Sequence, residues 1–256
     1  MTAILETHGL TVQFGGITAL DRVDFTMTSG QLCGLIGPNG AGKTSFIDAV
    51  CGFVVAEGRV VFDGMDISSV TAHRRTRLGL CRTFQSVELF DDLDVLGNLE
   101  VGVASSGWRS VLRDLASPRQ GHVQTAAVDR AIDLAGLGQV LHCRPTQLSP
   151  ALRRMVGIGR ALALEPKLLL LDEPAAGLDR SESQELGGRL DAIRSTGVTI
   201  LLVDHDTDLV FSCCDAIYVL DRGAVMASGC SADVRADDGV VAAYLGRPFG
   251  DRDPVG

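Results

Sequence analysis

An eight-residue stretch, GPNGAGKT at positions 37–44, contains the residue types that wrap a phosphate group. Glycines in the pattern G-x-x-x-x-G-K-[ST] allow successive backbone N–H groups to point inward at phosphate oxygens. Lys43 would place its charge on the β and γ phosphates of a nucleotide, and the Thr44 hydroxyl would ligate magnesium. Only two lysines occur in the chain, and one stands here. The predicted phosphate-binding residues are Gly37, Pro38, Asn39, Gly40, Ala41, Gly42, Lys43, Thr44 and Ser45.

Two acidic residues follow an apolar run in KLLLLDE at positions 167–173. Asp172 can hold magnesium, and Glu173 should lie on the other side of the strand end, where it could orient or deprotonate an attacking water. A second run, VTILLVDHD at 198–206, ends with His205, which could donate a hydrogen bond to the γ-phosphate. Ligands collect at the carboxyl ends of parallel strands, so these side chains predict a hydrolytic site with Glu173 as its base.

The elements around these residues are those of an α/β protein. QLCGLIG at 31–37 predicts a strand and FIDAVCG at 46–52 predicts a helix, with the phosphate loop between them. The chain of 256 residues is 46% hydrophobic and has no long Pro/Gly/Ser linker, which favours one compact unit. Its longest apolar runs have the length of strands, and the first residues lack a secretion pattern, so we expect a cytosolic chain without a membrane span.

Charge and cysteine content argue against several other classes of protein. The formal net charge of −9 disfavours a nucleic-acid partner, and we expect the Arg-rich run at 73–82 to be a solvated helix face. Seven cysteines without a CxxC pair predict buried apolar side chains, with neither a disulfide framework nor a zinc site.

GPNGAGKT, LLLLDEP and VDHD, in this order and at these separations, make the chain resemble the nucleotide-binding subunit of an ATP-binding-cassette (ABC) transporter. The resemblance covers the chain from Leu5 to about Leu245, and FGGITALDRVDF is most similar to one of the two ATPase subunits of Liv-type importers for branched-chain amino acids. It implies ATP and Mg²⁺ as cofactors and a peripheral position on the cytoplasmic face of the cell membrane. The implied partners are two integral membrane permease subunits and, indirectly, an extracytoplasmic substrate-binding protein.

Three single residues take roles by this resemblance. Gln85 in TFQ is similar to the family's Q-loop, which acts at magnesium and the attacking water. Asp179 in AGLD is similar to the D-loop, which faces the opposite subunit. Phe14 matches the aromatic residue that stacks on adenine, although a core phenylalanine would fit the same pattern.

The implied fold is a P-loop NTPase (RecA-like) core with an antiparallel β lobe and an inserted helical subdomain. We expect a single ABC nucleotide-binding domain over 1–256, with the core and β lobe in 1–85 and 161–256 and the helical subdomain in 86–160. The stretch SVELFDDLDVLGNL at 86–99 resembles the surface on which membrane subunits rest. Its Leu89 and Phe90 are either exposed there or part of the core of the helical subdomain.

LSPAL at positions 148–152 stands where the family has its signature LSGGQ. Of the serine, the two glycines and the glutamine of that signature, only the serine is retained, as Ser149. Pro150 has no N–H, Ala151 adds a Cβ where backbone must approach phosphate, and Leu152 cannot hydrogen-bond. Ser149 should still cap a helix that begins at Pro150. The composite site that uses this signature is therefore expected to bind nucleotide and turn over slowly. Arg153 or Arg154 could compensate, but we expect both to face solvent.

In this family each ATP site combines the phosphate loop of one subunit with the signature of the other. The resemblance therefore implies a second ABC ATPase subunit with an intact signature as the partner, in a heterodimer. Three alternatives remain open: a non-hydrolysing regulatory subunit, a soluble ABC ATPase outside transport, and a small-molecule kinase on the same phosphate loop.

Overall fold

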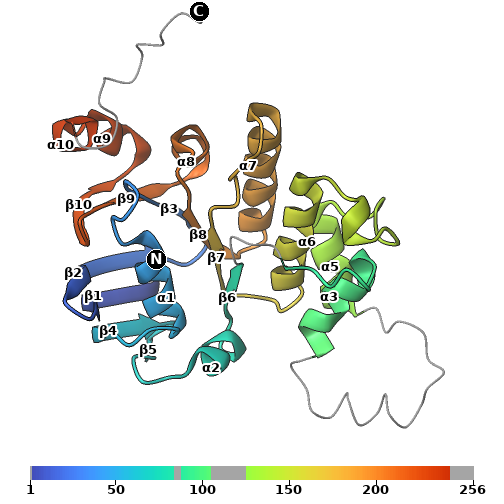
Figure 1. The fold of residues 1–256 in the computed structure, drawn as a ribbon, viewed down its shortest axis with the longest axis horizontal. Coiled ribbons are helices and arrows are strands. Elements are labelled where there is room, and N and C mark those ends of the chain that lie inside the picture. Colours follow the sequence, from blue (N-terminus) through green and yellow to red (C-terminus); the bar gives the residue numbers. More distant parts are fainter. Residues whose placement is uncertain (1, 84–87, 105–124, 243–256) are drawn as a thin grey trace, which may run out of the picture.

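Two β-sheets with helices around them make up the fold of the computed structural model, which describes residues 2–83, 88–104 and 125–242 (Figure 1). The strands are β1 (Ala3–Phe14), β2 (Ile17–Thr28), β3 (Leu32–Ile36), β4 (Glu57–Phe62), β5 (Met65–Asp66), β6 (Leu80–Thr83), β7 (Leu168–Asp172), β8 (Thr199–Val203), β9 (Ala216–Asp221) and β10 (Ala224–Gly229). The helices are α1 (Lys43–Cys51), α2 (Ala72–Arg77), α3 (Val95–Ala104), α5 (Ala126–Ala135), the 3₁₀ turn η1 (Pro145–Gln147), α6 (Pro150–Leu162), α7 (Arg180–Ser195), α8 (Thr207–Cys213), α9 (Ser231–Ala236) and α10 (Asp238–Val240).

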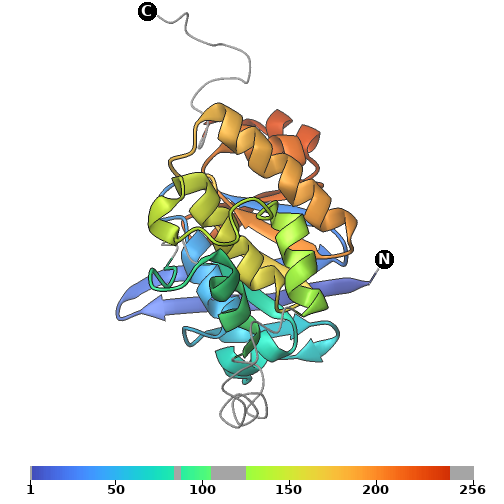
Figure 2. The same cartoon turned by 90° about the vertical axis from the view of Figure 1, so that its right-hand side faces the viewer.

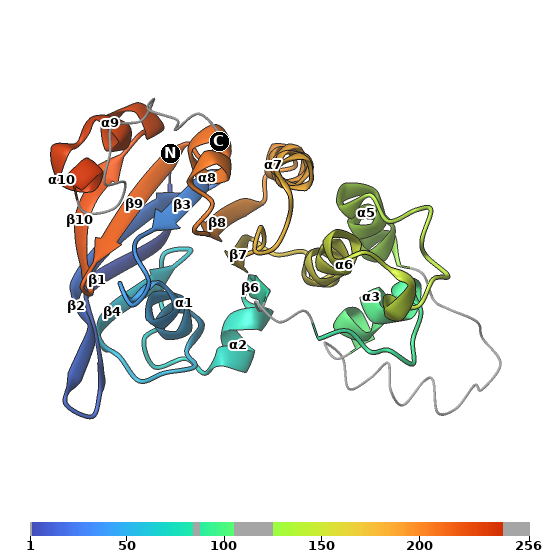
Figure 3. The same cartoon turned by 45° about the horizontal axis from the view of Figure 1, so that its top comes forward.

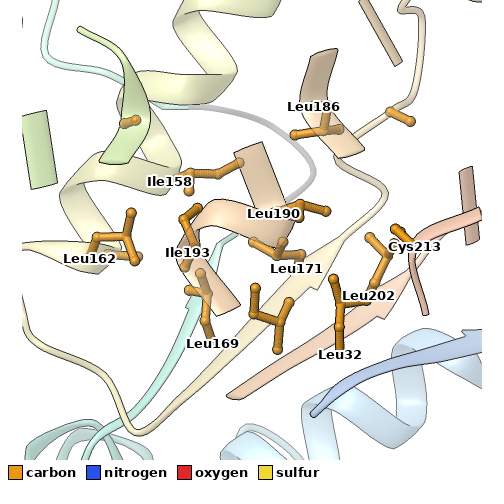
Figure 4. Close-up of a cluster of buried hydrophobic side chains, with 14 of the residues drawn as sticks. Leu32, Ile158, Leu162, Leu169, Leu171, Leu186, Leu190, Ile193, Leu202 and Cys213 are labelled. Carbon is orange, nitrogen blue, oxygen red and sulfur yellow. The ribbon is translucent and has the colours of Figure 1, made fainter. Parts of the chain in front are cut away.

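The larger sheet has the strand order β10-β9-β3-β8-β7-β6, parallel except for β10. Its central strands are apolar and buried on both faces, as expected of parallel strands covered by helices. In β7, Leu169 and Leu171 pack with the helices on one face, as Figure 4 shows. Leu168 and Leu170 pack with α1 and the smaller sheet on the other. Alternation along the strand therefore puts Asp172 on the α1 side.

The smaller sheet is antiparallel, with the order β2-β1-β4-β5, and it lies beside α1 (Figure 1). Phe25 of β2 contacts Phe46 of α1 with 5.0 Å between ring centroids. Phe25 also contacts Tyr218 of β9, whose hydroxyl donates to the carbonyl of Thr26. These contacts fix the phosphate-loop helix between the two sheets. The predicted antiparallel β lobe is confirmed.

Helices α3, α5 and α6 form an arm at one end of the molecule, as Figures 1 and 3 show, and this end faces the viewer in Figure 2. Apolar side chains pack the three helices of this arm together, among them Leu99 of α3, Ile132 of α5 and Val156 of α6. Their cluster continues onto the parallel sheet. The predicted helical subdomain is therefore confirmed, and the side chains of α6 link it to the sheet. No helix in the described part of the chain has the length and apolar character needed to span a bilayer.

The Arg-rich run at 73–82 is only partly a solvated helix face, and the prediction is wrong for Arg75 and for residues 80–82. Leu80, Cys81 and Arg82 belong to strand β6, and neither Arg75 nor Arg82 is exposed. Arg75 is buried, and its Nη1 donates to the carbonyls of Ala49 and Val50 at 2.9 and 2.7 Å. These carbonyls belong to the last turn of α1, whose negative dipole end attracts a cation. The Ala49 carbonyl also accepts from the amide of Gly52 at 3.1 Å. Arg82 is the second exception and lies in the site described below. Of the cysteines, Cys230 is exposed, which also differs from the prediction.

Candidate nucleotide-binding and catalytic site

The phosphate loop links β3 to α1 and depends on glycine at specific positions. Gly42 is the N-cap of α1 with φ +105°, and a Cβ there would lie 2.6 Å from the carbonyl oxygen of Ala19. A Cβ on Gly37 would lie 2.3 Å from the carbonyl oxygen of Leu220. No larger residue fits either position without moving backbone. The first turn of α1 carries no acidic side chain, so its amides remain available to an anion.

Lys43, the first residue of α1, is buried beneath this loop. Its Nζ donates to the carbonyls of Gly37 and Pro38 at 2.7 and 3.1 Å. Burial lowers the pKa of Lys43, while Glu173, Asp172 and Asp204 oppose that shift. The ammonium group therefore lies near the acids at the ends of β7 and β8, where the charge of a bound phosphate would stabilise it.

Glu173 directly follows β7 and lies near His205. Its side chain is partly buried, and the distance from Glu173 Oε2 to His205 Nδ1 is 3.9 Å. His205 is more exposed and lies 3.7 Å from the buried Asp204. Glu173 has φ +49°, a left-handed conformation that costs a non-glycine residue about 1–3 kcal/mol. The tertiary structure thus brings together Lys43, Asp172, Glu173 and His205 from three separate sequence segments.

The donor atoms near the loop suit magnesium. Thr44 offers a hydroxyl oxygen from the first turn of α1, and Asp172 offers a carboxylate from the end of β7 on the same side of the sheet. Oxygen ligands of this kind, supplemented by phosphate oxygens and water, are what Mg²⁺ prefers. The residues present therefore fit the ion.

The structure describes only one of the two remaining residues that were assigned by resemblance, Phe14 and Gln85. Phe14 ends β1 with half of its surface exposed, so the alternative of a core phenylalanine does not hold. Gln85 lies outside the described residues. In the neighbouring stretch, Leu89 is partly buried against the helical arm, whereas Phe90 is exposed.

The signature segment begins α6, away from the phosphate loop of the same chain (Figures 1 and 3). The predicted cap is confirmed: Ser149 is the N-cap, Pro150 is the first helical residue, and Ser149 Oγ accepts from the amide of Leu152 at 3.3 Å. Pro150 has no N–H and the Leu152 amide is already used. Ala151 therefore supplies the remaining amide among the first three helical residues.

Asp179, which was assigned to the D-loop by resemblance, is exposed and caps α7. Its Oδ1 accepts from the amide of Glu182 at 2.9 Å, and Glu182 accepts in return from the amide of Asp179 at 3.0 Å. This reciprocal pair is a capping box, which fixes the start of α7.

Comparison with known proteins supports this fold. Residues 20–176 match the family described as ABC transporter. The match covers more than half of the chain, which therefore belongs to the ABC transporter family and carries its ATP-binding ATPase domain. The phosphate loop, Asp172 and Glu173 all fall inside the matched residues.

The similar curated proteins are named as ATP-binding proteins of amino-acid transport. The chain is 34% identical over 249 residues to the high-affinity branched-chain amino acid transport ATP-binding protein BraF of Pseudomonas aeruginosa, covering 95% of this chain and 98% of BraF. It is 34% identical over 251 residues to LivG of Escherichia coli K12, with the same coverage. Among solved structures, an ATP-binding cassette of an ABC transporter in its ADP conformation has a TM-score of 0.85 and 29% identity, covering 96% of this chain and 100% of that chain.

Arg82 is a site residue that the sequence interpretation missed. Its Nη2 donates to Asp172 at 2.8 Å, its Nη1 pairs with Asp48 of α1, and only 7% of its side chain is exposed. Burial lowers the pKa of Arg82, but hydrogen bonds to Asp48 and Asp172 outweigh burial and raise it overall. An arginine at the end of the apolar run LGLC was the available signal, because a buried charge requires a partner.

Replacing Arg82 with methionine should lower the free energy of unfolding by about 3 kcal/mol, because the carboxylates of Asp48 and Asp172 would lose their shared counterion. Urea denaturation of the purified chain measures this loss. Arg74→Met, on the exposed face of α2, is the matched control and should change stability little. Equal losses in the two variants would show that the Arg82 bridge does not stabilise the fold.

Proposed function

We propose that this chain hydrolyses ATP to power a membrane importer for branched-chain or related amino acids, as one half of a heterodimeric ATPase pair. The substrate class is supported by the names of the similar proteins BraF and LivG. The pairing is supported by one observation: Glu173 and His205 lie together in this chain, whereas its signature turn has lost most of its donors.

In this proposal the amides of the phosphate loop and Lys43 hold the phosphates of ATP, and Phe14 stacks on its adenine. Mg²⁺, held by Thr44, Asp172 and Gln85, would neutralise charge on the phosphate oxygens. Further support comes from the position of Asp172 on the α1 side of β7.

Hydrolysis itself is assigned to Glu173 and His205. Glu173 accepts a proton from the attacking water, and Gln85 helps to orient that water. His205 donates a hydrogen bond to the γ-phosphate as charge develops there. The proximity of Glu173 to His205 supports a shared role at one phosphate.

The chain acts as a single cassette, with 1–85 and 161–256 as its core and 86–160 as its helical subdomain. Ser149, Pro150, Ala151 and Asp179 face the second ATPase subunit, which supplies an intact signature to this chain's phosphate loop. Two integral membrane permease subunits hold the pair at the cytoplasmic face of the membrane, and an extracytoplasmic binding protein delivers substrate to them. The exposed Phe90 is a candidate contact for a permease.

Sedimentation of the Glu173→Gln variant with magnesium-ATP tests the pairing, because blocked hydrolysis should trap any ATP-bridged dimer. We expect the variant to bind ATP and remain monomeric, because the first turn of α6 offers too few donors to close over a partner's phosphates. A direct ATP-binding measurement on the same sample establishes that the phosphate loop is occupied.

The matched control adds Pro150→Gly, Ala151→Gly and Leu152→Gln to Glu173→Gln, which restores the signature. This variant should dimerise when magnesium-ATP is added. A stable dimer of Glu173→Gln alone would overturn the heterodimer and return the chain to self-pairing.

A further inference from the structure

The strained backbone at Glu173 needs support from its surroundings, because a left-handed glutamate persists only where neighbouring contacts hold it. Part of that support comes from β8 and the residue after it. The amide of Glu173 donates to the carbonyl of Val203 at 2.7 Å, and the amide of Ala175 donates to Asp204 at 2.8 Å. Asp204 has no exposed surface and also accepts from the amide of Asp206 at 2.9 Å, so it is a rigid anchor.

The other part of that support comes from the signature helix. Arg154, on α6, donates from Nη1 to the carbonyls of Pro174 and Ala176 at 2.5 and 2.7 Å. Burial lowers the pKa of Arg154, while the charges of Asp204 and Glu182 oppose that shift. The expectation that Arg154 faces solvent is therefore wrong. Since Nη1 is bonded within its own chain, it does not replace the donors that the signature has lost.

Arg154 and Asp204 hold the same three residues, Pro174 to Ala176, through complementary backbone groups. Arg154 donates to the carbonyls of Pro174 and Ala176, and Asp204 accepts from the amide of Ala175 between them. These residues directly follow Glu173, so any shift of the segment rotates the glutamate carboxylate. Arg154 also lies within two turns of Ser149 on one continuous helix.

We propose that Arg154 is a positioning residue for Glu173 and couples the start of the signature helix to the catalytic base of the same chain. Contact between Ser149 and a nucleotide bound to the partner subunit would shift α6. Arg154 would transmit that shift to Pro174. Nucleotide binding at one composite site would thereby affect hydrolysis at the other. The inference rests on the proposed role of Glu173 as the base.

Hydrogen exchange on the purified full-length chain tests the contact without any partner. In Arg154→Gln, the amides of Ala175 and Ala176 should exchange at least about tenfold faster, because the segment loses one of its two anchors. Exchange in the phosphate loop and α1 should stay unchanged. Arg153→Gln, one residue earlier on the helix, is the matched control and should leave the segment as in the natural chain. Unchanged exchange at these amides, or an equal rise throughout the chain, would overturn the proposal.

Turnover provides the second readout, measured in the chain with restored LSGGQ so that the self-pair is competent. Arg154→Gln should lower kcat about tenfold, because the base is misplaced, while KM for ATP stays the same. Arg154→Lys keeps a cationic donor and should recover part of kcat. A change in KM with kcat intact would overturn a positioning role. Failure of the proposed function would appear separately, as turnover insensitive to Glu173→Gln, and the exchange result would still report on the contact.

Discussion

Replacing Glu173 with glutamine is expected to lower ATP turnover by at least about a hundredfold while ATP binding persists. The amide has nearly the shape of the carboxylate but cannot accept a proton from water. The phosphate loop and Lys43, to which the proposed function assigns nucleotide binding, are untouched. Turnover is measured by phosphate release from the importer purified with its subunits, and from the self-pairing chain with restored LSGGQ.

Glu185→Gln is the matched control for this loss of charge. Glu185 lies on α7 with its side chain largely exposed, 3.8 Å from Arg189. Turnover should therefore remain near that of the natural chain. If Glu173→Gln left the turnover of the importer unchanged, the chain would be a non-hydrolysing regulatory subunit, and the proposed function would fail.

Restoring the signature is expected to raise the turnover of the chain on its own by about a hundredfold, the usual effect of one preorganised donor at a developing charge. The variant carries Pro150→Gly, Ala151→Gly and Leu152→Gln. The two glycines return an N–H at position 150 and remove a Cβ at position 151, and the Leu152→Gln change adds a side-chain donor. Ser149 still caps the helix, so α6 should remain folded.

The single change Pro150→Ala separates the effect of the missing N–H at position 150 from the effect of the altered side chains. It returns the N–H but leaves the side chains in the way, so it should give only part of the increase. Circular dichroism of each variant checks that helix content is preserved. If the natural chain already turned over as fast as the restored variant, the altered signature would not limit the rate, and the reason for a heterodimer would disappear.

Local sequence was sufficient to predict the phosphate loop, the two acids where β7 ends and the capped start of α6. Each depends on neighbours within a few residues: glycines that permit the loop, an apolar run that must be a buried strand, and a serine before a proline. Resemblance to a family added the antiparallel lobe and the helical subdomain. Local periodicity alone does not predict how strands and helices are arranged in space.

Only the tertiary structure decided which charges are buried and what they hold. Arg82 meets Asp48 and Asp172 across 34 and 90 residues of chain, and Arg154 meets Pro174 across 20. An arginine with other arginines close by in the chain looks solvated in the sequence, because the sequence does not reveal partners that distant. Desolvation makes such a residue depend on the carbonyls and carboxylates that folding brings to it. The sequence by itself determined the chemistry of this cassette, and the packing of α1, α6, β6 and β7 determined how its acids are held.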